Sequence, residues 1–216
     1  MSDAFRRATE VRLRGSGRAD GMGDMADMRD QRRDRSVFDA EVHDGWDIGG
    51  NANGGYLLAI AARAMADAVG RPPLTITSHY LRPAPAGPCE VEVEVVRSGR
   101  RLATVSATLF QAERAIIRVL GTFGEQQPGG PSYSTGPPVD LPSWDDCRPR
   151  PRTGEAPGLV SRVPLRIHPD DVGYGTGEPS GDAQMRGWFD LPDGEPIDSF
   201  ALLLAVDSFA PPIYNT

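Results

Sequence analysis

The stretch WDIGGNANGGYLLAIAARAMADAVG, residues 46–70, decides the fold of this chain. It opens with four glycines and two asparagines in ten residues and continues as an almost uncharged segment. Asn53 is a typical helix N-cap, because its side-chain oxygen accepts hydrogen bonds from the first free backbone N–H groups. Gly70 and the following Pro72 and Pro73 predict the end of the helix. The segment between them has a wide apolar face, which predicts a buried helix: Tyr56, Leu57, Ile60, Ala61, Ala64 and Met65.

The segments on both sides of this helix have the patterns of strands. Residues 89–96, CEVEVEVV, alternate strictly between apolar residues and glutamate, which is typical of a strand with one buried and one solvated face. Further strands are predicted at 36–42, 74–81, 101–111 and 115–123, with turns at 97–100 and 112–115. This order predicts an α+β fold, in which one long helix packs on one curved antiparallel sheet.

A weaker copy of the same order follows a Pro/Gly-rich linker, which we place at residues 127–159. Strands are predicted at 161–169 and 183–191, and an apolar helix at 200–210 starts at a capping Asp198 or Ser199. Such a helix must be covered by other elements, yet the sequence stops at Thr216. Strands from another chain or an incomplete reading frame would explain this, and we favour the second. Because exposed strand edges associate, we also expect a homo-oligomer.

The composition excludes several classes of function. The net charge of −7 and the pI near 5.0 argue against nucleic acid as the main partner. No apolar run is long enough for a membrane span, and the N-terminus lacks a secretory pattern. Cys89 and Cys147 lie far apart and are expected to be reduced, which favours a cytoplasmic protein. Residues 1–35 have no sustained apolar period, so a disordered extension is predicted there.

Three segments together indicate a family: NANGGYLLA, SHYLRPA and VEVVRSGRRLATVSATLFQ. In this order they resemble the acyl-CoA thioesterase II-type double hot-dog proteins of the thioesterase-like superfamily. The resemblance implies two hot-dog modules, each a long helix wrapped in an antiparallel sheet. The N-terminal module would span residues 36–126, and a partial C-terminal module would span 160–216. The resemblance also implies hydrolysis of acyl-CoA to the free acid and coenzyme A, with no metal or other cofactor.

Asp207 is the candidate catalytic residue. The helix dipole disfavours a carboxylate in the last turn of a helix, so Asp207 is either a functional residue or an exposed side chain at a fraying end. In the resembling thioesterases a carboxylate at this position activates the hydrolytic water, together with a Thr and a Gln from later strands. Since those strands would follow Thr216, the resemblance predicts that this chain alone hydrolyses acyl-CoA poorly or not at all.

The glycine cluster is the candidate oxyanion site. Its spacing does not fit a dinucleotide-binding G-x-G-x-x-G motif, and the chain has no lysine for a P-loop. A helix N-terminus with bare glycines could bring a thioester close to free N–H groups that stabilise an oxyanion. Alternatively, the glycines only allow close packing of helix and sheet. We assign oxyanion and substrate binding to Asn53, Gly54, Gly55, Tyr56, His79 and Arg82.

The last two of these residues lie on or after a predicted strand. His79 is a candidate for the acyl pocket, although a lone strand histidine is more often structural. Arg82 could pair with the phosphates of coenzyme A. The motifs of a G-x-S-x-G hydrolase and of H-E-x-x-H or C-x-x-C zinc sites do not occur. Two rival functions stay open: a hot-dog enoyl-CoA hydratase, which would be expected to have a histidine paired with its aspartate, and a non-catalytic acyl-CoA-binding module.

Overall fold

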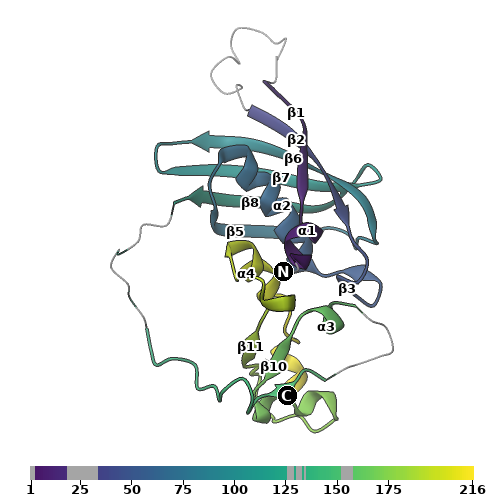
Figure 1. Ribbon diagram of the computed structural model, residues 1–216, viewed down its shortest axis with the longest axis vertical. Coiled ribbons are helices and arrows are strands. Elements are labelled where there is room, and N and C mark those ends of the chain that lie inside the picture. Colours follow the sequence, from purple (N-terminus) through teal and green to yellow (C-terminus); the bar gives the residue numbers. More distant parts are fainter. Residues whose placement is uncertain (1–2, 19–33, 126–128, 130–132, 134, 152–157) are drawn as a thin grey trace.

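A six-stranded antiparallel sheet forms the larger part of the molecule (Figure 1). The computed structural model describes residues 3–18, 34–125, 129, 133, 135–151 and 158–216. The strand order in the sheet is β1-β2-β6-β7-β8-β5, and every neighbouring pair is antiparallel. The strands are β1 (Val11–Arg18), β2 (Asp34–Val42), β5 (Pro73–Tyr80), β6 (Gly87–Ser98), β7 (Leu102–Gln111) and β8 (Arg114–Gly124).

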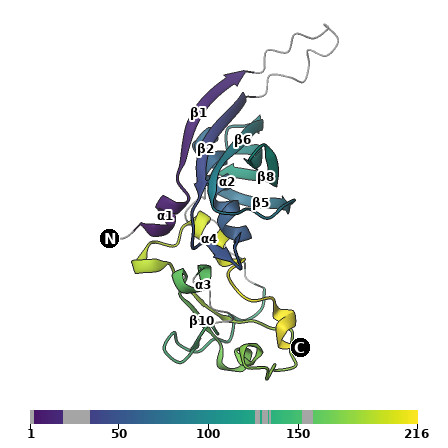
Figure 2. The same cartoon turned by 90° about the vertical axis from the view of Figure 1, so that its right-hand side faces the viewer.

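The helix α2 (Gly54–Val69) lies in the curve of this sheet (Figure 2), as the sequence predicts. The six residues of its predicted apolar face are each at most 2% exposed. The side chain of Asn53 accepts a hydrogen bond from the N–H of Tyr56 at 3.0 Å, which confirms the N-cap. Gly70 ends the helix with a φ of +63°, a conformation that glycine adopts without strain.

The first two glycines of residues 46–70 form a tight turn. The strands β3 (Asp47–Ile48) and β4 (Asn51–Ala52) form a small hairpin, with Gly49 at φ +63° and Gly50 at φ +83° between them. Two successive positive φ angles are what a two-residue hairpin loop requires. The N–H of Gly50 donates to Asp47 Oδ2 at 2.9 Å. This hairpin leads directly into α2, so it sets where the helix begins.

The predicted meander is also confirmed. In β6 the side chains of Cys89, Val91 and Val93 are buried, while the glutamates between them are partly or fully exposed. The β7–β8 turn consists of Ala112 and Glu113, which both have positive φ angles and form a tight hairpin loop without glycine. The periodicity of two therefore gives the correct inner face of the sheet.

The prediction of a disordered extension at residues 1–35 is wrong for its described part. Ala4–Ala8 form the short helix α1, and β1 adds an edge strand to the sheet. Phe5 is 1% exposed and its ring lies 5.6 Å from that of Trp46, centroid to centroid. The hydroxyl of Tyr56 donates to the carbonyl of Ala8 at 2.8 Å. Residues 19–33 lie outside the described part of the chain.

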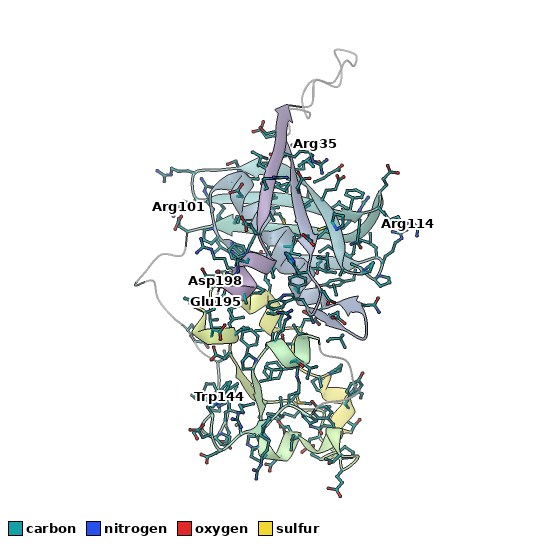
Figure 3. All side chains as sticks on the ribbon, turned by 45° about the vertical axis from the view of Figure 1, so that its right-hand side comes forward. Arg35, Arg101, Arg114, Trp144, Glu195 and Asp198 are labelled. Carbon is teal, nitrogen blue, oxygen red and sulfur yellow. The ribbon has the colours of Figure 1, made fainter. Side chains whose placement is uncertain are left out.

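The start of α1 is bound by the second half of the molecule. The carboxylate of Glu195 accepts hydrogen bonds from the N–H groups of Phe5 (3.0 Å) and Arg6 (2.8 Å). Figure 3 shows Glu195 and Asp198 close to α1 and α4. The composition of the N-terminus hides these anchors, because few apolar residues are involved and their partners are remote in sequence.

The second half contains a smaller sheet with the order β11-β10-β9. Its strands are β9 (Arg148–Pro149), β10 (Leu165–Ile167) and β11 (Gly187–Phe189), and the one-turn helix α3 (Leu159–Arg162) precedes β10. The segment predicted as one strand at 161–169 is therefore divided between a helix and a strand. β9 and the buried Cys147 fall within the predicted linker, so that part of the linker belongs to the second half.

The apolar helix predicted at 200–210 is shorter than expected. It forms α4 (Ser199–Ala205), whose first N–H groups, those of Phe200 and Ala201, donate to Asp198 Oδ1. α4 packs against α2 and buries Ala201 and Leu204, while Leu202 remains 55% exposed. Within the described ranges, no helix is long and apolar enough to cross a membrane.

Candidate active site

Asp207 lies two residues after α4, and its carboxylate faces the first turn of α2. Asp207 Oδ2 accepts hydrogen bonds from Asn53 Nδ2 at 2.8 Å and from the N–H of Gly55 at 3.0 Å. Asn53 Nδ2 also donates to the main-chain carbonyl of Asp207 at 2.9 Å. The C-terminal end of α4 disfavours a carboxylate, but the positive end of α2 compensates for it. The structure thus joins Asp207 to two predicted site residues, Asn53 and Gly55, that are far from it in sequence.

Gly54 and Gly55 allow the two helices to approach each other. A Cβ atom on Gly55 would lie 2.4 Å from the carbonyl oxygen of Leu203 in α4. A Cβ atom on Gly54 would lie 2.9 Å from Asp207 Oδ2 and 3.0 Å from the ring of Tyr80. Close packing therefore requires both glycines. Their packing partners include α4 and Asp207, and not the sheet alone as the simpler sequence interpretation assumed.

The first three N–H groups of α2 have different roles. Gly55 donates to Asp207, and Tyr56 donates to the side chain of Asn53. The N–H of Gly54 forms no hydrogen bond with the residues that the structure describes. The predicted open helix end is therefore reduced to one available donor among these three, and it lies beside Asp207.

Tyr80 of β5 and Asp207 bind opposite ends of the peptide group between Gly54 and Gly55. Its hydroxyl donates to the carbonyl of Gly54 at 2.9 Å, while the N–H of that peptide group, on Gly55, donates to Asp207. Burial raises the pKa of Tyr80, and the charge of Asp207 raises it further, so the hydroxyl remains a donor at neutral pH. The sequence analysis did not select Tyr80, although strand alternation next to His79 was the available signal.

Two clefts meet at Asp207. One, of about 480 Å³, is lined by residues including Tyr80, Arg82 and Asp207. The other, of about 700 Å³, is lined by residues including Asn53, Arg150 and Asp207. Ala52 and Gly54 border both clefts, so Gly54 lies where they join. Both volumes are in the range of small-molecule sites.

The remaining predicted residues have different positions. Arg82 lines the smaller cleft and donates from Nη1 to the carbonyl of Ala115 at 2.8 Å. Tyr56 is fully buried among core residues, and its N–H is used by the cap, so the prediction that it contacts substrate is wrong. His79 is exposed and pairs across the sheet with Arg118, on the strand face opposite to Tyr80. It does not line either cleft.

A long helix wrapped by an antiparallel sheet is the architecture of a hot-dog protein. The sequence matches the family described as acyl-CoA thioesterase N-terminal domain over residues 42–124. It matches the acyl-CoA thioesterase C-terminal domain over residues 138–216. The chain therefore belongs to the acyl-CoA thioesterase family, and the predicted α+β double hot-dog fold is confirmed.

Solved structures agree with this assignment. A candidate thioesterase II from Thermobifida fusca is 27% identical, with a TM-score of 0.78 over 98% of this chain and 74% of that one. A hot-dog protein from Alicyclobacillus acidocaldarius is 21% identical, with a TM-score of 0.75 over 99% and 72% of the two chains, and supports the fold alone.

The curated relatives are longer than this chain. The thioesterase-like protein TwmA of Talaromyces wortmannii is 27% identical over 216 residues, which is 83% of this chain and 60% of TwmA. An uncharacterized protein of Mycobacterium tuberculosis is 26% identical over 141 residues, covering 56% and 47% of the two chains. The chain thus spans about half the length of the curated relatives it matches.

Proposed function

We propose that this chain hydrolyses acyl-CoA thioesters, with Asp207 as the residue that activates water. One observation supports this most: the Asp207 carboxylate is fixed through Oδ2 by Asn53 and Gly55, next to the free N–H of Gly54 and at the junction of two clefts. A general base must be held in place beside the reacting carbonyl, and an oxyanion needs a preorganised donor. Membership of the thioesterase family supports the same reaction class.

In the proposed reaction, Asp207 accepts a proton from a water molecule whose oxygen attacks the thioester carbonyl carbon. The carbonyl oxygen becomes an oxyanion and accepts a hydrogen bond from the N–H of Gly54. When the tetrahedral intermediate collapses, the C–S bond breaks and the thiolate of coenzyme A leaves. The proton held by Asp207 returns to the thiolate sulfur, so the products are the free acid and the thiol. Arg82, at the smaller cleft, is suited to the phosphates of the carrier.

An enoyl-CoA hydratase of the hot-dog class would be expected to have a histidine beside its aspartate. None of the residues that line the two clefts at Asp207 is a histidine. The geometry therefore favours hydrolysis over hydration.

The test is thiol release from a panel of acyl-CoAs by wild type and Asp207→Asn. The variant should lose about 10²-fold or more in kcat, the scale for a lost general base. It should keep its fold, since an amide oxygen can accept the two hydrogen bonds that Oδ2 now accepts. Asp67→Asn, an exposed change on α2, is the matched control.

Because its relatives are longer, the assay also includes any residues that the reading frame encodes after Thr216. Equal turnover of Asp207→Asn and wild type would show that Asp207 is not the base. Binding of acyl-CoA without thiol release by either form would support a non-catalytic module instead.

A further inference from the structure

Arg150, which lies in the predicted linker, places its guanidinium against the main chain that follows Asp207. It follows β9, and its backbone N–H donates to the carbonyl of Leu165 at 3.2 Å, which fixes the main chain. Its Nη1 donates to the carbonyl of Ser208 at 2.6 Å. Ser208 is adjacent to Asp207 in sequence, so the cation lies at the same wall of the larger cleft as the proposed catalytic base.

Among the residues that the structure describes, the guanidinium of Arg150 has no counter-ion. Its Nε and Nη2 are buried without a hydrogen-bond partner, and no carboxylate of the described residues lies within 4.0 Å of it. Burial lowers its pKa. A buried charge without a partner destabilises a fold unless something else requires it.

Two other partly buried arginines show the usual solution. Arg186 has a bidentate contact with Asp171, at 2.9 Å and 3.0 Å. Arg63 donates to Thr9 and stacks 4.3 Å above the ring of Phe200. Arg150 differs from both, because in the described part of the chain its side chain has a hydrogen bond only to a neutral carbonyl.

A structural role explains only one nitrogen of Arg150. The carbonyl of Ser208 lies just past α4, and a cation near the C-terminal end of a helix is stabilised by the helix dipole. That accounts for Nη1. It leaves Nε and Nη2 without a function, and these are the two nitrogens that form one edge of the guanidinium fork.

We propose that Arg150 is an anion subsite of the larger cleft, so that the preferred substrate is a thioester with an anionic oxygen group bound there. This inference rests on the proposed thioesterase function. An acyl chain that ends in a carboxylate fits best, because Arg82 at the other cleft is suited to the phosphates of coenzyme A. A phosphate of coenzyme A is the second possible source of the anionic oxygen group. Binding requires the guanidinium to turn toward the cleft, which exchanges the Nη1 hydrogen bond to Ser208 for contacts with the anion and breaks none at Nε or Nη2.

The first experiment compares wild type and Arg150→Gln on four thioesters. Glutaryl and pentanoyl groups have the same number of carbons and differ by the terminal carboxylate. Each is presented on coenzyme A and on N-acetylcysteamine, which has no phosphate. Gln can still donate to the carbonyl of Ser208, so the variant removes the charge with little change to the fold. Arg148→Gln, an exposed change in β9, is the control.

The expected result is a loss of about tenfold or more in kcat/KM for both glutaryl thioesters, the size of a lost charge-assisted hydrogen bond. Both pentanoyl thioesters should change less than about twofold, within the effect of an exposed substitution. Arg150→Lys should restore part of the difference. A loss confined to the coenzyme A thioesters would assign the subsite to a carrier phosphate. Equal changes on all four substrates, or no change, would overturn the proposal.

A binding measurement separates this proposal from the proposed function. Glutarate and adenosine 3′,5′-bisphosphate are tested as separate ligands by thermal unfolding of the full chain. At least one should raise the melting temperature of wild type and of Arg148→Gln, but not of Arg150→Gln. If no thioester is hydrolysed, the proposed function fails, and this shift alone decides the anion subsite. If neither ligand distinguishes the variants, the subsite does not exist.

Discussion

The two halves of the molecule contain helices of very different length that pack side by side, and Asp207 follows the shorter one. α2 has sixteen residues and is wrapped by six strands, while α4 has seven and packs on α2 and β5. The larger half supplies the donors, Asn53 and Gly55, and the smaller half supplies the carboxylate. The site therefore depends on how the halves dock, more than on the completeness of either one.

The N-terminal segment is the strongest test of that docking, because Phe5 packs in the first half while its N–H binds Glu195 of the second. Phe5→Ala should reduce the free energy of unfolding by about 3–5 kcal/mol, the usual cost of removing a buried aromatic ring. Arg7→Ala, exposed on the same short helix, should change it by less than about 0.5 kcal/mol. Urea unfolding measures both. If the two variants unfold at the same urea concentration, α1 is not part of the core.

Protonation of Asp171 at low pH should lower the stability of the second half. Burial alone would raise its pKa, but the hydrogen bonds from Arg186 outweigh burial and hold the pKa below its usual value. A lowered folded pKa stabilises the protein above the unfolded value of about 3.9, and this stability is lost as the pH falls through the folded pKa. Asp171→Asn should cost about 1.5–3 kcal/mol at neutral pH.

The pH dependence is the decisive part of that measurement. Thermal unfolding at pH 7, 5 and 3 should give a constant difference between wild type and Asp171→Asn down to about pH 4, and a smaller one below it. The exposed Asp182→Asn serves as control. A difference that stays the same at pH 3 would mean that the Asp171–Arg186 pair is not a source of stability.

Close approach of the two helices can be tested at Gly55. Gly55→Ala should cost about 1–3 kcal/mol, because its Cβ would meet the backbone of Leu203 and neither helix can move freely. Gly15→Ala in β1 is the matched control, since a Cβ there meets no atom within 4 Å. Chemical unfolding of both variants gives the comparison. Equal stability would mean that the halves are not docked through this contact.

Local signals were sufficient to predict most of the first half from sequence. The alternation at 89–96 and the caps at Asn53 and Gly70 depend on neighbours in the chain, and the structure confirms them. The role of the N-terminus was not predictable, because the partners of Phe5 are remote and its neighbours are polar. The short strands of the second half were placed too long for the same reason: their ends are set by packing, which the local pattern does not contain.

The candidate site was predictable in part. Asp207 stood out because it breaks a local rule, and its compensation by α2 explains why it is tolerated. On β5 the prediction named His79, whereas its neighbour Tyr80 borders the cleft, because adjacent side chains of a strand lie on opposite faces. Arg150 could not be recognised, because only the folded chain shows that its charge lacks a partner.

The smallest expected effect concerns the peptide group between Gly54 and Gly55, which Tyr80 of the first half and Asp207 of the second half both bind. The hydroxyl of Tyr80 donates to the carbonyl of Gly54, and this polarises the adjoining N–H of Gly55 toward the Asp207 carboxylate. Tyr80→Phe keeps the ring against Gly54 and removes only the hydroxyl. The Asp207 carboxylate is then held less firmly by the N–H of Gly55, so the loss should fall on kcat and leave KM nearly unchanged. We expect kcat/KM to fall about two- to tenfold, the range for one neutral hydrogen bond, with unfolding little changed. Tyr133→Phe, at a tyrosine that is 90% exposed, is the control. A loss confined to KM would mean that Tyr80 contributes to the cleft wall and does not act on Asp207.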